Sequence, residues 1–230
     1  MVFDNRRLTM KEKVMLITGA TSGIGKATAI KAGDAGMRLI VTGRRENKLN
    51  ELVEQIGADN AFAVSADATD YKALAQVVEK GMEHWGQLDA VFANAGMGVS
   101  AAGTEQGDPK EWDKLIDLNI KGLLWTAQLT LPHLRQQLGH FILTSSAAGR
   151  AQLKGSIYGA SKWFAYGFGI NLAAEMAQWG GRCTTICPGM VNTPFFDEAK
   201  PDKLDPADVA DAVLYAINAQ QKNNIREIYL

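Results

Sequence analysis

The sequence predicts an α/β fold: a single doubly wound domain with a seven-stranded parallel sheet and helices on both faces. Short apolar runs alternate with helical patterns along the chain, and such alternation is typical of parallel sheets with right-handed crossovers. The apolar runs contain few polar residues, as expected of strands that are covered on both faces. The 230 residues are 47% hydrophobic and 21% charged, an ordinary composition and length for one globular domain.

The elements are expected in a regular order. The seven predicted strands cover residues 14–18, 38–42, 61–66, 88–96, 140–146, 182–189 and 225–230. The predicted helices run from about residue 23, over 44–56, over 70–85, from about 109 to 137, around 156–179 and over 206–220. No linker rich in Pro, Gly or Ser divides the chain, so residues 1–230 are expected to form one domain.

Charge and hydropathy exclude several classes of partner. The net charge of −1 creates no field that would recruit nucleic acid or an anionic membrane. No apolar run approaches the roughly 18 residues of a membrane span, and the charged first thirteen residues do not resemble a secretory signal. The sequence therefore predicts a cytoplasmic protein with neither a nucleic-acid partner nor a membrane partner.

The cysteines and histidines indicate neither a disulfide nor a metal site. Cys183 and Cys187 lie four residues apart in a predicted strand, which separates them by about 13 Å, too far for a disulfide. Two buried thiols in a reducing compartment are expected instead. His84, His133 and His140 are scattered without a metal-binding spacing.

A glycine-rich turn follows the first predicted strand. The stretch TGATSGIG at 18–25 places glycines in the pattern G-x3-G-x-G, between a strand and a helix. Backbone can approach a pyrophosphate closely at such a turn, where helix N–H groups point toward the anion. The cofactor contacts expected here come from Gly19, Thr21, Ser22, Gly23, Ile24 and Gly25. A tight turn without a ligand is the alternative interpretation.

The ordered set of motifs resembles the short-chain dehydrogenase/reductase family. It comprises TGATSGIG, NAG at 94–96, a serine, Y-x3-K at 158–162 and PG at 188–189, and it covers nearly the whole chain. The resemblance implies a Rossmann-type fold and a nicotinamide-dependent oxidoreductase. It also implies a homo-oligomer, a dimer or tetramer, that assembles through the long helices at 110–137 and 156–179.

The end of the second strand predicts which nicotinamide cofactor binds. An acidic residue roughly 20 positions beyond the glycine turn would bind the ribose 2′-OH of NAD, but this strand ends in Thr42-Gly43-Arg44-Arg45. A carboxylate would repel a 2′-phosphate, whereas arginine can bind it bidentately. We therefore expect NADP(H). The alternative is that both arginines are solvated residues that open a helix.

The resemblance implies further cofactor contacts. Asp67 and Ala68 are expected at the adenine, although Asp67 could instead be a turn or cap residue. Small residues that end the fourth strand are expected to let backbone approach the cofactor: Asn94, Ala95 and Gly96. The segment after the sixth strand is expected to bind the nicotinamide carboxamide through Pro188, Gly189, Val191 and Thr193. Each motif could also be an ordinary strand-end turn.

A tyrosine and a lysine four residues apart share one face of a helix, with Cβ atoms about 5–6 Å apart. On its own the pair could be surface decoration. The resemblance implies that Tyr158 is the general acid or base, and that Lys162 lowers its pKa and binds the nicotinamide ribose. Ser145, thirteen residues before the tyrosine, is expected to bond the substrate oxygen, with Ser146 facing away. The backbone carbonyl of Asn119 is expected to hold a water that links Lys162 to solvent.

The substrate is expected between residues 97–107, the loop at 147–155 and a loop at about 190–206. The candidate wall residues are Met97, Leu153, Met190, Phe195 and Phe196, with Lys154 as a possible cation. The resulting hypothesis is an NADP(H)-dependent reductase of carbonyls, reversible on secondary alcohols. A ketoreductase of carrier-linked substrates and a catalytically silent sensor or scaffold are alternatives, and the intact Ser/Tyr/Lys set favours an enzyme.

Overall fold

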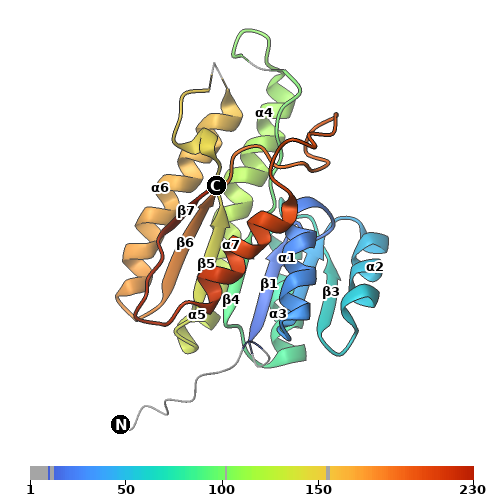
Figure 1. Ribbon diagram of the computed structural model, residues 1–230, viewed down its shortest axis with the longest axis vertical. Coiled ribbons are helices and arrows are strands. Elements are labelled where there is room, and N and C mark those ends of the chain that lie inside the picture. The colour runs from blue at the N-terminus through green and yellow to red at the C-terminus, as the bar shows by residue number, and fades with distance from the viewer. Residues whose placement is uncertain (1–9, 11–12, 102, 154–155) are drawn as a thin grey trace.

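Seven parallel strands form one sheet in the computed structural model, which describes residue 10 and residues 13–101, 103–153 and 156–230. The strands lie in the order β3-β2-β1-β4-β5-β6-β7 (Figure 1). They are β1 (Val14–Thr18), β2 (Arg38–Gly43), β3 (Ala61–Ser65), β4 (Ala90–Ala93), β5 (His140–Thr144), β6 (Arg182–Cys187) and β7 (Glu227–Tyr229). The predicted seven-stranded parallel sheet is confirmed.

The strand order reverses beside β1. This strand pairs with β2 on one side and with β4 on the other, so the chain leaves the centre of the sheet in two opposite directions. A crevice opens at such a switch point, outside the carboxyl ends of the strands. The fold therefore fixes where a ligand can bind before any side chain is considered.

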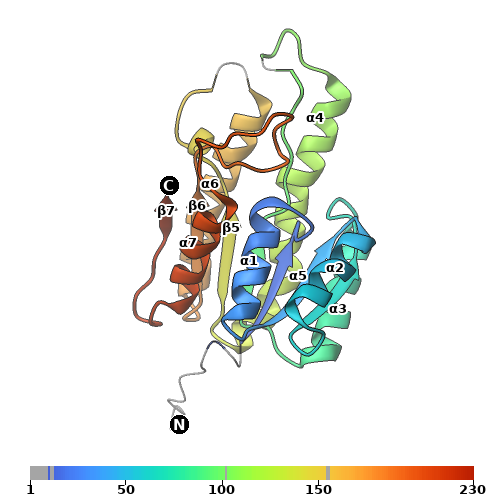
Figure 2. The ribbon, with the colours of Figure 1, turned by 45° about the vertical axis from the view of Figure 1, so that its right-hand side comes forward.

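Two helical layers cover the sheet (Figure 2). One layer contains α1 (Gly23–Asp34), α2 (Glu46–Ile56) and α7 (Pro206–Asn218), and the other contains α3 (Tyr71–Trp85), α4 (Pro109–Ile116), α5 (Leu123–Gln136) and α6 (Ile157–Ala177). Alternate residues of each strand enter different cores. In β1, Leu16 packs with the α3/α5/α6 side and Ile17 with the α1/α2/α7 side, as the period of two requires.

Acidic and hydroxyl side chains fix where several helices begin. Asp70 accepts hydrogen bonds from two backbone amides at the start of α3. Asp205 forms a capping box with Asp208 at the start of α7, and Ser156 accepts from the Gly159 amide at the start of α6. Such caps satisfy backbone donors that have no partner within the helix.

The helix expected over 109–137 is interrupted. A π-helical segment, η2 (Asp117–Gly122), lies between α4 and α5. Segments of this kind occur frequently at functional sites. A short 3-10 turn, η3 (Ala147–Gly149), follows β5. Both irregular segments contribute to the site described below.

Two further features of the described residues bear on the predictions. Cys183 and Cys187 are both buried and free. None of the described helices is both long and apolar enough to cross a membrane.

Candidate functional site

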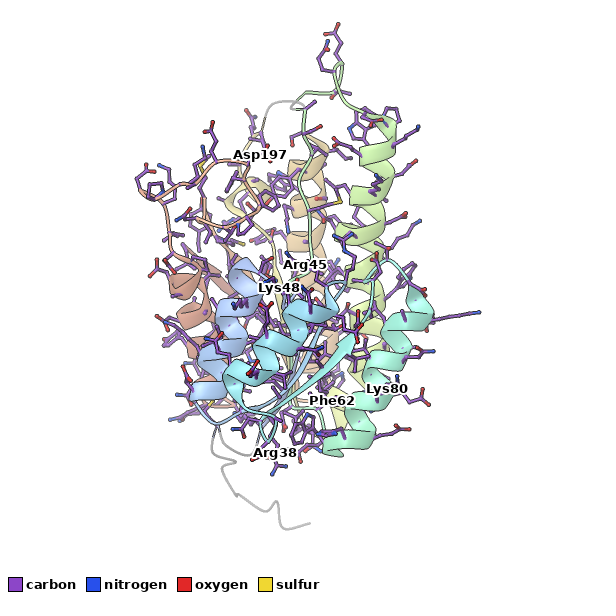
Figure 3. The ribbon with its side chains drawn as sticks, turned by 90° about the vertical axis from the view of Figure 1, so that its right-hand side faces the viewer. Arg38, Arg45, Lys48, Phe62, Lys80 and Asp197 are labelled. Atoms are coloured by element: carbon purple, nitrogen blue, oxygen red, sulfur yellow. The ribbon has the colours of Figure 1, made fainter. Side chains whose placement is uncertain are left out.

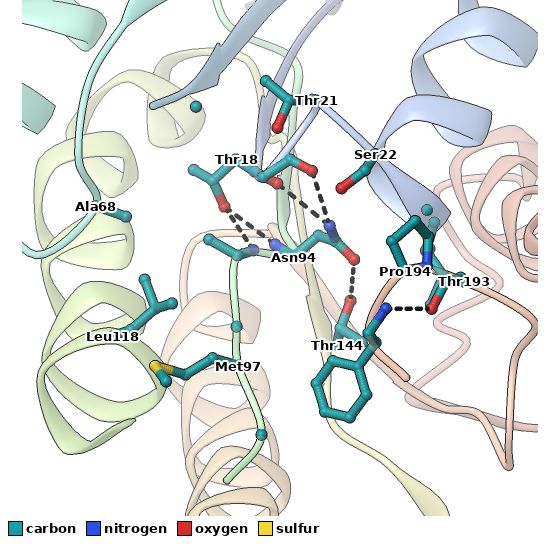
Figure 4. A pocket seen from close by; sticks show the side chains of 18 of the residues that line it. Thr18, Thr21, Ser22, Ala68, Asn94, Met97, Leu118, Thr144, Thr193 and Pro194 are labelled. Carbon is teal, nitrogen blue, oxygen red and sulfur yellow. Dashed lines mark hydrogen bonds between the residues drawn. The ribbon is translucent and has the colours of Figure 1, made fainter. Parts of the chain in front are cut away.

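A cavity of about 490 Å³ lies at the carboxyl ends of the central strands (Figure 4). It extends from the glycine turn to the tyrosine of α6. Most of the predicted site residues line it: Gly19, Thr21, Ser22, Gly23, Ile24, Arg44, Arg45, Asp67, Ala68, Asn94, Ala95, Gly96, Ser145, Tyr158, Lys162, Pro188, Gly189, Val191 and Thr193. Two predicted residues, Gly25 and Asn119, are not among the lining residues.

The glycine turn has the backbone geometry of a phosphate cradle. Gly19 and Gly23 have φ angles of 67° and 53°, which favour glycine over residues with a Cβ. Ser22 precedes α1 without a capping hydrogen bond from its side chain, so the first amides of the helix remain available to an anion. Gly25 has a packing role, because a Cβ there would lie 2.3 Å from the Gly19 carbonyl oxygen.

Two arginines mark the far end of the cavity. Arg44 and Arg45 are exposed and line it, and Nη2 of Arg45 donates to Oγ1 of Thr21 at 2.8 Å. Figure 3 shows Arg45 and Lys48 near the start of α2, away from Arg38 at the other end of the sheet. Lys48 is paired with Glu51 at 2.8 Å. The arginines thus provide guanidinium groups where β2 ends without a carboxylate.

Asp67 has the turn role that was its alternative interpretation. Its Oδ1 accepts hydrogen bonds from the Thr69 amide at 2.9 Å and the Thr69 hydroxyl at 2.8 Å. The cap of α3 is Asp70 instead. Because Asp67 also lines the cavity, the turn holds its carboxyl at the cavity wall.

Asn94 joins three strands (Figure 4). Its backbone N–H donates to Oγ1 of Thr18 at 3.1 Å, and its side-chain Nδ2 donates to the Thr18 carbonyl at 3.4 Å. The hydroxyl of Thr144 donates to its Oδ1 at 3.2 Å. The side chain therefore fixes the ends of β1, β4 and β5 relative to one another, and the next residues, Ala95 and Gly96, line the cavity.

Lys162 is a buried cation at the centre of the site. Its Nζ donates to the Thr144 carbonyl at 3.0 Å and lies 5.7 Å from the centroid of the Tyr158 ring. Burial lowers the pKa of Lys162 to about 8, because a low-dielectric environment disfavours the charged form.

The pKa of Tyr158 differs from the sequence expectation. Burial raises it above its ordinary value, and a hydrogen bond with Ser146 opposes the rise. Lys162 was expected to lower this pKa, but the causes of the shift in the chain alone are burial and Ser146, and burial has the larger effect. The phenol is therefore held protonated at neutral pH, which suits an acid.

The two serines after β5 both line the cavity but have different surroundings. The Ser145 hydroxyl donates to the Lys162 backbone carbonyl at 2.8 Å, and the residue is only 1% exposed. The Ser146 side chain is the one that lowers the pKa of Tyr158. The expectation for Ser145 assumed strand alternation, but β5 ends at Thr144, so alternation does not apply to either serine.

Asn119 lies within the π-helical segment and is buried. Its Oδ1 accepts from the Met97 amide and its Nδ2 donates to the Met97 carbonyl, each at 2.9 Å. Nδ2 also donates to the hydroxyl of Ser161 at 3.0 Å. The side chain thus connects the segment after β4 to α6, behind Lys162.

The segment after β6 passes across the glycine turn. The Pro188 carbonyl accepts from the Ala147 amide at 2.8 Å, and Val191 forms a bridge with Leu204. A Cβ on Gly23 would lie 3.1 Å from the methyl group of Thr193. This strand end and the glycine turn therefore enclose the middle of the cavity between them.

The residues predicted to form the substrate wall lie only in part along the cavity. Met97, Phe195 and Phe196 line the cavity, but Leu153 and Met190 do not; these two side chains are 50% and 54% exposed. Both were chosen for apolarity and position in a loop, which do not fix side-chain direction. Lys154 lies outside the described residues.

Sequence reasoning missed several lining residues. Besides Ser146 they include Thr18, Ala66, Leu74, Gly98, Leu118, Thr144 and Pro194. Most lie at strand ends or one residue beyond a recognised motif, so the order of the strands was the signal that could have indicated them. The described residues contain no group of three or more His, Cys, Asp or Glu placed to hold a metal ion.

Comparison with known proteins agrees with this arrangement. The short chain dehydrogenase family model matches residues 13–204. An uncharacterized oxidoreductase of Staphylococcus epidermidis is 38% identical over 226 residues, which cover 95% of this chain and 96% of the relative.

Two solved structures have the same fold at 25% identity. An alcohol dehydrogenase from the archaeon Thermococcus sibiricus, complexed with 5-hydroxy-NADP, has a TM-score of 0.87 with 95% of both chains covered. A 3-ketoacyl-(acyl-carrier-protein) reductase from Brucella melitensis, complexed with NADH, has a TM-score of 0.88 with 96% of this chain and 98% of the other covered. With the cavity, the Tyr158/Lys162 pair and the family match together, this chain belongs to the short-chain dehydrogenase family of oxidoreductases.

Proposed function

We propose that this protein is an NADP(H)-dependent oxidoreductase that transfers a hydride between nicotinamide and a carbonyl or secondary-alcohol substrate. One observation carries the proposal: Ser146, Tyr158 and Lys162 converge in the same cavity as the glycine turn and the two arginines. The relevant groups for proton transfer and for nucleotide binding therefore share one space. The intact set supports an enzyme rather than a silent sensor or scaffold.

Tyr158, Ser146 and Lys162 each have a distinct chemical role in the proposed reaction. The Tyr158 hydroxyl donates a proton to the carbonyl oxygen during reduction, or accepts one during oxidation, and its raised pKa keeps it protonated for the reductive direction. The Ser146 hydroxyl positions the substrate oxygen beside it. Lys162 holds the ribose hydroxyls and, when protonated, favours the phenolate. We assign the substrate contact to Ser146 and a supporting role to Ser145.

Asn119 supports this group from behind. Its side chain holds Met97 and Ser161, so the π-helical segment keeps a fixed distance from α6. We propose that its backbone carbonyl, left without a regular α-helical environment, holds a water on the route from Lys162 to solvent.

The nicotinamide cofactor, when bound, supplies or accepts the hydride. The glycine turn and the start of α1 would hold its pyrophosphate, and the segment from Pro188 to Thr193 would hold its carboxamide. Asp67 and Ala68 would contact the adenine. Arg44 and Arg45 support NADP(H) over NAD(H), because guanidinium groups bind a 2′-phosphate bidentately. Relatives with this fold include complexes with both cofactor types.

We also propose a cytoplasmic homo-oligomer. Large apolar side chains on the outer surfaces of α5 and α6 are exposed, namely Leu124, Trp163 and Ile170. Such a patch favours association, and the two buried free thiols suit a reducing compartment. Sedimentation velocity tests the assembly directly: a monomer at micromolar concentration would contradict it.

The function is tested by following the oxidation of NADPH and NADH with a panel of aldehydes, diketones and ketoesters. We expect turnover that prefers NADPH, and a decrease of roughly 10²–10⁴-fold in Tyr158→Phe, the usual contribution of general acid catalysis. Tyr166→Phe is the matched control, because that phenol lies on the same helix, outside the cavity lining, and bonds Glu227 at 3.2 Å. Equal losses in both variants, or a preference for NADH, would contradict the proposal.

A further inference from the structure

We infer that the natural substrate is an uncharged carbonyl compound whose reacting carbon carries an aromatic ring, and that this ring packs against Phe195. The inference rests on the proposed function and specifies its substrate class. It is carried by the distribution of charge in the cavity and by the position of one phenylalanine beside Tyr158.

Apart from Lys162, the charged side chains among the described lining residues follow β2 and β3, at the glycine-turn end of the cavity. These side chains are Arg44, Arg45 and Asp67. Lys162 is the remaining charged lining residue, and its Nζ is bonded to the Thr144 carbonyl. Among the described residues, none other than Lys162 therefore offers a cation to a substrate carboxylate or phosphate beside Tyr158, and desolvating such a group without a dedicated cation is costly.

Apolar and aromatic side chains also line the cavity, and one of them, Phe195, contacts Tyr158. These lining residues include Met97, Leu118, Pro194, Phe195 and Phe196. Phe195 and Phe196 contact each other edge-on, with ring centroids 5.3 Å apart. An apolar substrate group that packs against them is removed from water, which favours its binding.

Phe195 contacts the ring of Tyr158. Its ring centroid lies 5.5 Å from that of Tyr158, at an interplanar angle of 53°, within the range of attractive aromatic pairs. Its amide donates to the Thr193 hydroxyl at 3.3 Å, which ties it to the segment after β6. The ring is nevertheless 45% exposed, so one part of its surface remains available to a ligand.

Gly98 provides the space that the Phe195 ring occupies. A Cβ on Gly98 would lie 2.9 Å from Cζ of Phe195, so any larger residue would displace the ring. The glycine of the segment after β4 and the phenylalanine of the segment after β6 therefore fit each other across the mouth of the cavity. This fit holds a flat apolar surface beside the Tyr158 ring, against which a planar aryl carbonyl can lie.

The test compares three aldehydes: benzaldehyde, 4-formylbenzoate and propanal. Benzaldehyde and 4-formylbenzoate share the ring and differ by a carboxylate, whereas propanal has no ring. We measure kcat/KM with saturating NADPH for the wild type, Phe195→Ala, Phe195→Tyr and Gly98→Ala. Tyr215→Ala is the control, because this tyrosine is exposed on α7 and does not line the cavity.

We expect the wild type to prefer benzaldehyde over 4-formylbenzoate by roughly tenfold or more, in line with the discrimination that apolar pockets achieve. In Phe195→Ala, kcat/KM for benzaldehyde should fall roughly tenfold more than for propanal. Phe195→Tyr should retain the preference because it keeps the ring, and Gly98→Ala should reduce it because it displaces the ring.

Other outcomes would contradict the inference alone or the proposed function as well. A wild-type preference for 4-formylbenzoate, or equal losses for benzaldehyde and propanal in Phe195→Ala, would overturn the inference while leaving the proposed function intact. Absence of turnover with all three aldehydes and with the wider carbonyl panel would refute the proposed function, and the inference with it.

Discussion

Ser145 and Ser146 are neighbours in the chain but have different environments. Counting thirteen residues back from Tyr158 selects Ser145, whereas the serine that lowers the pKa of Tyr158 is Ser146. Residue counts locate a motif correctly only when the intervening loop has the usual length. Here the turn η3 follows the serines directly, and a sequence count cannot show which of the two side chains influences Tyr158.

The serine assignment predicts unequal effects of two alanine substitutions. Ser146→Ala should lower kcat/KM by roughly 100-fold, the usual cost of losing one hydrogen-bond donor to the reacting oxygen. Ser145→Ala removes a bond to the Lys162 carbonyl and should cost about 1 kcal/mol of unfolding free energy, with a smaller effect on the rate. Steady-state kinetics and urea unfolding of both variants check this. A larger rate loss in Ser145→Ala would restore the original assignment.

The pKa of Lys162 predicts the pH above which the enzyme loses activity. Its pKa of about 8 means that the ammonium loses its proton as pH rises through that value, whereas the raised pKa of Tyr158 keeps the phenol protonated to higher pH. Since kcat/KM reports ionisations of the free enzyme, kcat/KM for NADPH should decline above about pH 8. Lys162→Arg keeps a positive charge, so any residual activity should lack this decline. A profile that stays flat to pH 9.5 in the wild type would contradict the role given to the ammonium.

At the scale of elements, the strands were more predictable than the irregular segments. Apolar runs such as residues 14–18 indicated β1 correctly because such strands are buried on both faces. The π-helical segment at 117–122 could not be predicted, because its sequence, DLNIKG, has ordinary helical periodicity and the extra turn depends on contacts with distant residues. The apolar loop residues Leu153 and Met190 likewise gave no signal of which way their side chains point.

Replacement of Asn119 tests how strongly the π-helical segment stabilises the site. Asn119→Ala would leave the Met97 amide and carbonyl and the Ser161 hydroxyl without their present partner. Buried polar groups that lose their partners cost about 1–3 kcal/mol each, so the unfolding free energy should fall by roughly 2–4 kcal/mol, together with kcat. Asn119→Asp keeps the acceptor for the Met97 amide and should lose less.

The matched control for this change is Gln128→Ala, an exposed amide on α5. Circular dichroism during urea unfolding and steady-state kinetics should show little change in that variant. If Asn119→Ala were as stable and active as Gln128→Ala, the segment would not depend on the Asn119 side chain.

At the scale of the whole molecule, the two ends of the strands serve different purposes. The cavity lies at the carboxyl ends of the strands. A largely buried polar cluster lies at their amino ends and consists of Lys13, Asp89, His140, Arg182 and Thr184. His140 and Arg182 are paired in register at the starts of β5 and β6. The Asp89 carboxylate accepts from the Val14 amide at 2.8 Å, and Arg182 donates to the Ala219 carbonyl at the end of α7 at 3.1 Å. These residues are far apart in the sequence, and only the order of the strands in the sheet brings them together.

This cluster predicts sensitivity to acid that is independent of the site. Burial, Arg182 and Lys13 hold the pKa of His140 well below its ordinary value, so the folded protein keeps the imidazole neutral while the unfolded chain binds a proton near pH 6.5. The resulting stability is fully present above about pH 6.5 and is lost as pH falls below it, by up to about 1.4 kcal/mol per pH unit. Asp89, whose pKa is raised by burial, acts in the opposite sense at lower pH, in the range where a carboxyl titrates.

The measurement is the unfolding free energy from urea titrations between pH 5 and pH 7.5, for the wild type, His140→Gln and His133→Gln. In His140→Gln the decline below about pH 6.5 should be shallower by up to about 1.4 kcal/mol per unit, because glutamine has no proton to gain and can still bond Thr184, the present partner of His140 at 2.7 Å. His133, a partly exposed residue of α5, serves as the histidine control, and its variant should keep the wild-type slope. Identical slopes in wild type and His140→Gln would mean that other groups govern the acid response. His140 lies at the amino ends of the strands, and the cavity lies at their carboxyl ends. His140→Gln should therefore alter this slope while kcat/KM at pH 7.5 stays within about twofold of wild type, as expected for distant, independent sites.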